Sequence, residues 1–559
     1  MTITSDTKIT DIDNHLKVSA GPGAGKTHWL VNHIKNVLHH SDKLSISKKV
    51  ACITYTNIAV ETILNRLGTS ATQVEVSTIH SFLYKHIVKP YASFIAEEYN
   101  LNISKMDGHD ETILSNYSFL TEWKQRTNQA RIRDDNVVVE AFKKLQWIFD
   151  NEELHPRTPY PFRVAGYPIR NDSYMEYKKM TWEKGIIHHD DVLFFSYQVI
   201  KRFPFVAKVL SEKFPYFFID EFQDSNPIQV QIFRELAQNS SATIGVIGDM
   251  AQSIYGFQGA DYTQFQSFSL PNIQEYELQE NRRSSNEIIT LLNKIRNDLA
   301  QTPIRNTSFT KPYIFVGDMI SSLAQAQTIC SSEKVYTLSR QNITSNAMKA
   351  QINGGQLNHR LLDELKEKDS NKDRSILIYS CIRAVSYAKE NKFKDAIKEL
   401  EKLHLEKDKQ DNKKKSLEYL RVLLEDYQTY HETSLLEFSE FVKTNINKTI
   451  SKVSGEKIKT FYENYTFKQL SLCVSIPEDM SLHKTIHKAK GDEFDNVLVV
   501  LQEESHIDFL VKPNLLKEEH RVNYVAVSRA IDRLFISVPT LDEDKRELLE
   551  EYFEIQDID

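Results

Sequence analysis

The stretch Ala20-Gly21-Pro22-Gly23-Ala24-Gly25-Lys26-Thr27 decides the fold class of this chain. It follows a short apolar segment, 16–19, and precedes a helical pattern, 28–39. A phosphate loop requires this context of strand, glycine-rich turn and helix. Glycines let backbone N–H groups turn toward phosphate oxygens, and the helix N-terminus adds a favourable dipole. Lys26 would contact the outer phosphates, and the Thr27 hydroxyl would ligate Mg²⁺.

Short apolar strands alternate with helical patterns in two parts of the chain, which indicates two parallel sheets with crossover helices. The first part contains the segments 50–54, 216–219 and 244–247. The second contains 313–316, 335–338, 496–501 and 533–537. We therefore expect an α/β protein with two sheet domains, each interrupted by a mainly helical insertion. The predicted boundaries are 1–94, 95–185 (insertion), 186–272, 273–343, 344–474 (reduced insertion) and 475–559.

Composition limits the classes of protein to consider. A chain of 559 residues suits about three or four structural units. The net charge of −7 restricts any nucleic-acid contact to a local groove. The four cysteines are far apart, with no CxxC pair, which argues against a zinc or disulfide framework. We expect a cytoplasmic protein without a signal peptide or membrane span, and we expect the lysine-rich run 407–415 to be a solvated helix face or loop.

Two carboxylates, Asp220 and Glu221, end the apolar strand 216–219. A site that hydrolyses a nucleoside triphosphate needs one acid to hold Mg²⁺ and another to orient or deprotonate the attacking water. Consecutive residues at a strand end can supply both. We assign the metal role to Asp220 and the base role to Glu221.

The segments DEFQDSNPIQ (220–229) and GDMAQSIYGFQGA (248–260) resemble motifs II and III of UvrD/Rep/PcrA-type superfamily 1A helicases. Other motifs of that family have counterparts in the same order along the chain. Motifs Ia and Ib resemble 53–59 and 77–82, and the family's DFDDLL segment resembles 189–193. Motif IV resembles 278–284, the strand after it 338–342, motif V 485–494 and motif VI 524–530.

The resemblance implies two RecA-like motor domains with ATP bound in the cleft between them. The first domain would supply the phosphate loop, Asp220, Glu221 and the γ-phosphate sensor Gln252. The second would supply Arg283 and Arg529, whose planar guanidinium groups suit the spread charge of a transferring phosphoryl group. The remaining implied nucleotide contacts are His28, Arg282 and, at the ribose, Glu493.

The same resemblance implies a DNA strand that crosses both motor domains. Aromatic side chains allow stacking on any base, and small polar groups bind phosphates. The matching positions are Tyr55, Asn57, His80, Tyr255, Phe257, Thr485 and His487. Phe257 replaces the family's usual tryptophan, which keeps a smaller stacking face. The expected partner is single-stranded or partly duplex DNA.

Two departures concern the base of the nucleotide. The family usually has a glutamine just before the phosphate loop, whereas this chain has none before Gln73. Either groups near 11–15 bind adenine, or base selectivity is relaxed. The family's stacking tyrosine in motif IV is Arg282 here, and a guanidinium can also stack on a base.

Three classes of function were compared. The first is an ATP-dependent DNA translocase and helicase, moving 3′ to 5′ by analogy, in DNA repair or anti-phage defence. The second is a DNA-sensing ATPase subunit that activates a partner nuclease without processive unwinding. The compact layout resembles the B subunits of Gabija anti-phage systems, which implies an OLD-type nuclease partner. A P-loop kinase or GTPase is excluded, because no guanine-binding NKxD segment is present and the DEFQD and GDMAQS segments have no role in either class.

Overall fold

The computed structural model describes residues 1–106, 113–114, 116–331, 333–403, 408–476 and 481–558. Contacts divide the chain into two compact units. Unit 1 contains Met1–Arg283 and Asn297–Arg305, and unit 2 contains Ser284–Arg296 and Asn306–Asp559. Among the helices that the structure describes, none is both long enough and apolar enough to cross a bilayer.

Unit 1 is built on a seven-stranded sheet in which every neighbouring pair is parallel. Its order is β1 (Thr2–Ile3), β11 (Gln274–Leu278), β2 (Leu16–Ala20), β10 (Thr243–Gly248), β9 (Tyr216–Ile219), β3 (Val50–Thr54) and β4 (Val74–Thr78). The predicted strands of the first domain are confirmed. Because the strands are parallel, the loops that follow β2, β9 and β10 meet at one edge of the sheet.

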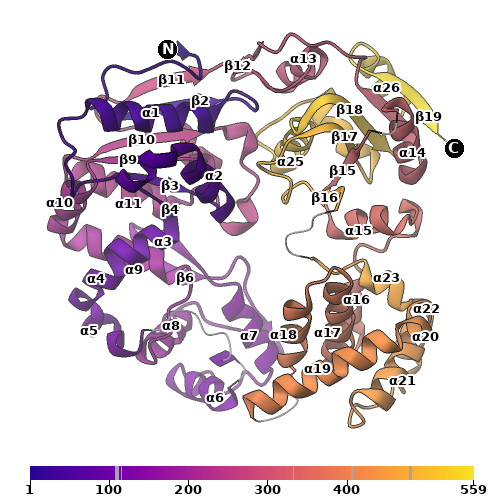
Figure 1. The fold of residues 1–559 in the computed structure, drawn as a ribbon. Coiled ribbons are helices and arrows are strands. Elements are labelled where there is room, and N and C mark those ends of the chain that lie inside the picture. The colour runs from indigo at the N-terminus through magenta and orange to yellow at the C-terminus, as the bar shows by residue number, and fades with distance from the viewer. Residues whose placement is uncertain (107–112, 115, 332, 404–407, 477–480, 559) are drawn as a thin grey trace. The chain divides into compact units, whose positions relative to one another are not determined.

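Both faces of this sheet are buried, as the side chains of β9 show. Tyr216 and Phe218 pack toward α1 (Lys26–His40) and α2 (Asn57–Leu67). Phe217 and Ile219 belong to the core on the opposite face. The helices of that face are α3 (Ile79–Leu83), α9 (Asp191–Arg202), α10 (Pro204–Lys213) and α11 (Pro227–Gln238). Figure 1 labels most strands of this sheet and the helices beside it. Burial on both sides explains why these strands are continuous apolar runs.

The first insertion combines helices with small hairpins. Its elements include α6 (Tyr117–Arg126), α7 (Asp135–Lys143), β5 (Gln146–Asp150), β6 (Glu153–Arg157), β7 (Arg163–Val164), β8 (Tyr167–Pro168) and α8 (Ser173–Glu183). The buried carboxylate of Asp191 accepts hydrogen bonds from Lys178 at 2.7 Å, Trp147 at 3.0 Å and Trp182 at 2.9 Å. These contacts tie the insertion to α9, so a buried charge is paired as its desolvation requires.

Unit 2 contains a second parallel sheet, of six strands. Its order is β16 (His483–Thr485), β15 (Val335–Ser339), β17 (Phe494–Val500), β18 (Ala530–Val538), β14 (Tyr313–Gly317) and β19 (Glu554–Ile558). The predicted strands of the second domain are confirmed, and β16 and β19 are added at the edges. The accompanying helices include α13 (Asn286–Ile295), α14 (Met319–Ile329), α15 (Asn342–Ala350), α24 (Asp508–Val511), α25 (Glu518–Val527) and α26 (Glu543–Leu549).

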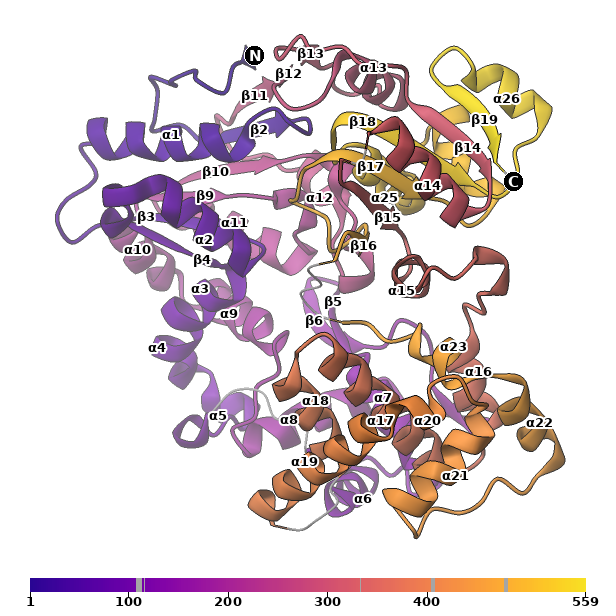
Figure 2. The same cartoon turned by 45° about the vertical axis from the view of Figure 1, so that its right-hand side comes forward.

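The second insertion is a helical bundle with its own apolar core (Figure 2). Its helices are α16 (Leu361–Lys368), α17 (Lys372–Lys389), α18 (Phe393–Glu401), α19 (Lys409–Glu425), α20 (Tyr427–Tyr430), α21 (Leu435–Asn445), α22 (Glu456–Asn464) and α23 (Phe467–Ser471). Most of the lysine-rich run lies in α19, where Lys413 and Lys414 are exposed, while Lys407 lies outside the described residues.

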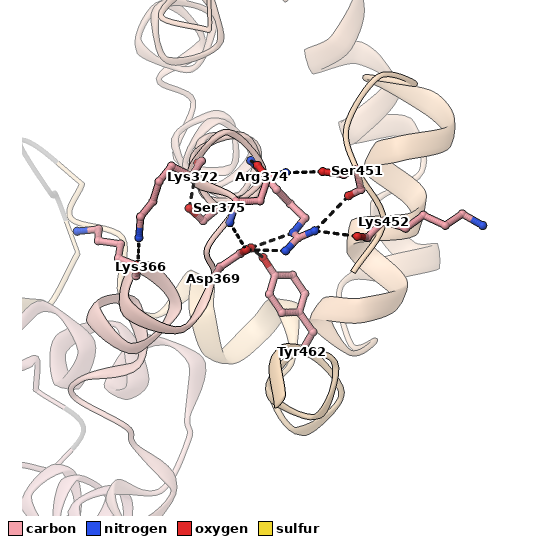
Figure 3. A network of polar contacts seen from close by, with 9 residues as sticks. Lys366, Asp369, Lys372, Arg374, Ser375, Ser451, Lys452 and Tyr462 are labelled. Atoms are coloured by element: carbon pink, nitrogen blue, oxygen red, sulfur yellow. Dashed lines mark hydrogen bonds and ion pairs between the residues drawn. The ribbon is translucent and has the colours of Figure 1, made fainter. Parts of the chain in front are cut away.

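A buried ion pair lies inside this bundle (Figure 3). Arg374 donates to both carboxylate oxygens of Asp369, at 2.9 and 2.5 Å, and Tyr462 donates to the same carboxylate at 2.7 Å. Arg374 also donates to the backbone carbonyls of Ser451 and Lys452. The network links α17 and α22 to the segment before α22.

The units divide later in the chain than the predicted boundary at residue 273. The strand β11, expected to open the second domain, instead pairs with β2 in the first sheet. Arg283, also expected from the second domain, is the last residue of the first part of unit 1. Parallel pairing of β11 beside β2 extends the first sheet and keeps the following segment with unit 1.

Candidate functional site

The phosphate loop joins β2 to α1, and its backbone needs glycine at two positions. Gly23 and Gly25 have φ angles of +72° and +79°, in the left-handed region that favours glycine. A Cβ at Gly23 would lie 2.5 Å from Oδ1 of Asn281. Conformation and space therefore both require the glycines that the sequence motif supplies.

Lys26 begins α1 and points its ammonium group toward Glu221. Its Nζ lies 3.7 Å from Oε1 of Glu221, and the side chain is only 12% exposed. This buried nitrogen has no hydrogen-bond partner among the described residues. A desolvated ammonium that lacks hydrogen bonds is well suited to receive phosphate oxygens.

Asp220 and Glu221 follow β9 at the same sheet edge as the phosphate loop. Burial and the adjacent Glu221 carboxylate raise the pKa of Asp220, and the charge of Lys26 opposes this shift. Glu221 has a φ of +52°, which is uncommon for a residue with a side chain. Two adjacent carboxylates and the Thr27 hydroxyl offer the hard oxygen ligands that Mg²⁺ prefers, so these residues fit that ion.

Gln223 connects the acidic pair to the next loop. Its buried side chain donates through Nε2 to Glu221 Oε2 and accepts, at Oε1, the backbone N–H of Asp249 at 3.0 Å. Gln252 in turn donates to Asp249 Oδ2 at 2.6 Å. The carboxylate predicted to act as base and the predicted γ-phosphate sensor therefore belong to one chain of hydrogen bonds.

Asp6 contacts two residues that were predicted to bind the nucleotide. Its carboxylate lies 3.0 Å from Nε2 of His28 and 2.9 Å from Nη2 of Arg282. The hydrogen bond with His28, aided by Arg282, lowers the pKa of Asp6. His28 directly follows Thr27, so this cluster borders the phosphate loop.

The segment 11–15 does not lie near the phosphate loop, so the expectation that it could bind adenine is wrong. Asp13 accepts a hydrogen bond from the hydroxyl of Tyr216, and His15 accepts one from the backbone N–H of Ile244. Tyr216 and Ile244 lie at the amino ends of β9 and β10. The phosphate loop leaves the carboxyl end of β2, at the opposite edge of the parallel sheet.

Arg283 is held beside the phosphate loop by its own backbone. Its N–H donates to Asn281 Oδ1 at 2.9 Å, and its carbonyl accepts from Arg305 at 3.2 Å. A Cβ at Gly23 would lie 2.9 Å from Cβ of Arg283. Within unit 1 the structure thus brings Arg283 together with the triphosphate cradle.

Arg529 and Glu493 belong to unit 2. The buried guanidinium of Arg529 donates to the carbonyls of Val525 and Asp492 and to the hydroxyl of Ser528, at 3.2, 3.5 and 2.9 Å. Glu493 is exposed just before β17. Glu493 lies in the segment that resembles motif V and Arg529 in the segment that resembles motif VI, and their nucleotide roles remain predictions.

A cavity of about 450 Å³ lies in unit 1 beside the residues predicted to bind DNA. Its lining includes side chains from the first sheet domain and from the first insertion: Tyr55, His80, Lys143, Lys144, Gln146, His189, Asp190, Asn226 and Gln258. Tyr55 stacks on Tyr255 with ring centroids 5.1 Å apart and donates to Gln258 at 2.9 Å. The cavity thus combines aromatic faces with amide, lysine and carboxylate groups.

His80 stacks on His189 with ring centroids 3.7 Å apart. Burial lowers the pKa of His80 to about 3, so its imidazole is neutral at physiological pH. Phe257 is 61% exposed and approaches Tyr255 at 6.1 Å. Asn57 is exposed at the first turn of α2 and does not line the cavity.

The two predicted DNA contacts of unit 2 follow β16. Thr485 ends that strand and is buried, and its carbonyl accepts the N–H groups of Lys488 and Ala489. His487 is partly exposed in the turn that these bonds close. Their contact with DNA remains a prediction.

Several residues of the two sites were missed from the sequence. Gln223 lies inside the motif II-like segment, 220–229, but the sequence does not show that its side chain is buried between two loops. Asp6 and Gln301 had no sequence signal, because only folding places them beside the phosphate loop, and His189 lay in the DFDDLL-like segment without an assigned role. Asn281 lay in motif IV without an assigned role.

Comparisons with known proteins agree with this geometry. Residues 2–271 match the UvrD/REP helicase N-terminal domain. Gabija protein GajB of Bacillus cereus (strain HuB5-5) is 24% identical, over 92% of each chain. The ATP-dependent DNA helicase PcrA of Staphylococcus aureus (strain Mu50 / ATCC 700699) is 22% identical, over 94% of this chain and 81% of its own. PcrA of Bacillus subtilis (strain 168) is 28% identical, over 54% of this chain and 39% of its own.

The family match covers the phosphate loop, the acidic pair and the aromatic cavity, and the longer alignments continue through unit 2. Residues 2–271 are thus similar to the UvrD/REP helicase N-terminal domain, and over most of its length the chain is similar to PcrA helicases and to GajB.

Proposed function

We propose that this chain is an ATP-dependent DNA translocase and helicase that moves 3′ to 5′. The observation that supports this most directly is the position of Lys26 beside the Asp220–Glu221 pair, with an ammonium group that has no hydrogen-bond partner in the described part of the chain. The same unit contains the aromatic cavity around Tyr55 and His80. One unit therefore holds a triphosphate cradle and a surface suited to single-stranded nucleic acid.

Hydrolysis would use the residues around the phosphate loop. Lys26 would bind the outer phosphates, while Glu221 would orient and deprotonate the attacking water. Gln223 would hold Glu221 in place through its side-chain amide. Mg²⁺, held by Thr27 and Asp220, would neutralise phosphate charge. Arg283 and Arg529 would stabilise charge on the transferring phosphoryl group, and Glu493 would contact the ribose.

The aromatic cavity would bind single-stranded DNA without sequence preference. Tyr55, Tyr255, Phe257 and neutral His80 offer ring faces on which any base can stack. Lysine and amide groups of the lining would contact the backbone. Because the protein is acidic overall, this contact would depend on local groups and would weaken as salt rises.

The test is ATP hydrolysis by the purified chain with and without single-stranded DNA, followed by unwinding of duplexes with a 3′ or a 5′ tail. We expect stimulation of hydrolysis by single strands and unwinding only from the 3′ tail. Hydrolysis that no single strand stimulates would contradict the proposal, and unwinding from the 5′ tail alone would contradict the polarity.

The alternative is a DNA-sensing ATPase subunit that activates an OLD-type nuclease in anti-phage defence. Its support is the similarity to Gabija protein GajB along nearly the whole of both chains. The bundle α16–α23, with exposed lysines on α19, would then serve partner or DNA contacts rather than strand separation.

Unwinding and nuclease activation distinguish the two functions. The chain is assayed alone for unwinding, and then with an OLD-type nuclease produced in the same cells for co-purification and DNA cleavage. Robust unwinding by the isolated chain would contradict a purely regulatory role. Cleavage that requires both proteins and intact Lys26, without unwinding, would favour that role.

A further inference from the structure

Gln301 lies in the segment Asn297–Arg305, where the chain returns to unit 1. The strands β12 (Glu280–Asn281) and β13 (Thr302–Pro303) pair in parallel, and the N–H of Thr302 donates to the carbonyl of Gln279 at 2.7 Å. Gln301 directly precedes β13 and is only 4% exposed. A buried side-chain amide in this position must satisfy its hydrogen bonds inside the protein.

The side chain of Gln301 contacts the outer wall of the phosphate loop. Its Nε2 donates to the carbonyl of Pro22 at 2.7 Å. A Cβ at Gly21 would lie 2.4 Å from the same nitrogen, so Gly21 provides the space that the amide occupies. The second position of the loop therefore needs glycine because of a side chain nearly 280 residues away.

Asn281 makes the matching contacts on the neighbouring strand. Its Nδ2 lies 3.4 Å from Oε1 of Gln301, and its Oδ1 accepts the N–H of Arg283 at 2.9 Å. The N–H of Arg282 donates to the carbonyl of Gly23 at 3.0 Å. Two consecutive carbonyls of the loop are thus held from outside it: that of Pro22 by Gln301, and that of Gly23 by Arg282, the residue before Arg283.

We propose that Gln301, together with Asn281, is a positioning residue of the nucleotide site, an inference that rests on the proposed ATP hydrolysis. Gln301 holds the phosphate loop in the conformation that binds triphosphate. Asn281 sets Arg283 at a fixed place beside that loop. Hydrogen bonds to the carbonyls on the outer side of the loop favour the conformation in which its N–H groups converge on phosphate.

The test compares the nucleotide affinity of two variants at Gln301 with that of the wild type. Affinity is measured by the fluorescence of an N-methylanthraniloyl ATP analogue at pH 6 and at pH 8, and each variant is compared with the wild type at the same pH. Gln301→Glu keeps the length of the side chain but presents a carboxylate oxygen to the Pro22 carbonyl. We expect binding weaker by about 10-fold at pH 8, as for one lost hydrogen bond. Burial beside the Pro22 carbonyl should raise the pKa of this carboxyl, so the fraction protonated at pH 6 can donate again and binding should recover in part.

Gln301→Met cannot donate at either pH, so its binding should be weakened about equally at both. In DNA-stimulated hydrolysis, both variants should raise KM for ATP at pH 8 with little change in kcat. The control is Gln274→Glu, because Gln274 also donates to a backbone carbonyl, that of Asn272, far from the loop along β11.

Unchanged nucleotide affinity in both variants would overturn the inference, as would an equal loss in Gln301→Glu at both pH values with a lowered melting temperature. Both results concern binding, which is measured without hydrolysis. A wild-type chain that binds nucleotide but shows no DNA stimulation would instead contradict the proposed function and leave the positioning role testable by binding.

Discussion

The side chain of Gln223 accepts the backbone N–H of Asp249 at 3.0 Å while its amide nitrogen donates to Glu221. A Cβ at Gly248 would lie 2.6 Å from the Gln223 carbonyl oxygen, so the two loops pack closely. This contact joins the loop after β9 to the loop after β10. Gln223 therefore links the predicted base, Glu221, through Asp249 to the predicted phosphate sensor, Gln252.

Gln223→Leu should lower the kcat of ATP hydrolysis by about 10-fold, with a smaller change in KM, because Glu221 loses the donor that orients it. Steady-state hydrolysis with saturating single-stranded DNA measures this. Gln231→Leu is the control, since Gln231 also donates to a carboxylate, that of Glu235, on the surface of α11. An unchanged kcat in Gln223→Leu would rule out the orienting role.

Lys26→Ala should reduce hydrolysis by at least about 100-fold, because the phosphate loop loses its only lysine charge. The comparison is Lys35→Ala on the same helix, where Lys35 donates to the carbonyl of Arg66 instead. DNA-stimulated phosphate release measures both. Equal activity of the two variants would show that the triphosphate binds elsewhere.

Tyr55→Leu should raise the concentration of single-stranded DNA that gives half-maximal stimulation by about 10-fold, because one stacking face is lost. Hydrolysis in the absence of DNA should not change. Phe205→Leu serves as the control, since Phe205 is an exposed aromatic residue that does not line the cavity. A Tyr55 variant with wild-type DNA dependence would exclude the cavity from DNA binding.

Arg374→Ala should destabilise the bundle α16–α23 by about 3–5 kcal/mol, because the Asp369 carboxylate would stay buried without its cation (Figure 3). Urea unfolding followed by fluorescence measures the loss. Arg421→Ala removes an exposed pair with Glu425 and should cost less than about 1 kcal/mol. Similar losses in both variants would contradict this account of the network.

The stability of the folded chain should decrease in acid because of His33. This side chain is buried against Trp29, and burial lowers its pKa from 6.5 to about 4. Between pH 6.5 and 4 the unfolded chain therefore binds a proton at His33 that the folded chain does not bind. The free energy of unfolding should fall by about 3 kcal/mol as the pH decreases over this range. His33→Leu should flatten this slope in unfolding curves between pH 7.5 and 4.5. The exposed His39→Leu should leave it unchanged.

The sequence alone determined the strand pattern, the phosphate loop and the identity of the acidic pair. These are local signals: apolar runs of strand length, glycines at fixed spacing and carboxylates directly after a strand. They predicted β3 and β9 to the residue and the start of α1 to within two residues. The mixed character of the first insertion was missed, because its hairpin strands are short.

Only the tertiary structure decided which distant residues meet. It placed β11 and Arg283 with unit 1, moved the segment 11–15 to the far edge of the sheet, and put Asp6 beside His28. Strand pairing and burial set these contacts across hundreds of residues, and no local spacing encodes them. The phosphate loop could be identified from eight residues, but the reason that Gly21 must be glycine is the side chain of Gln301.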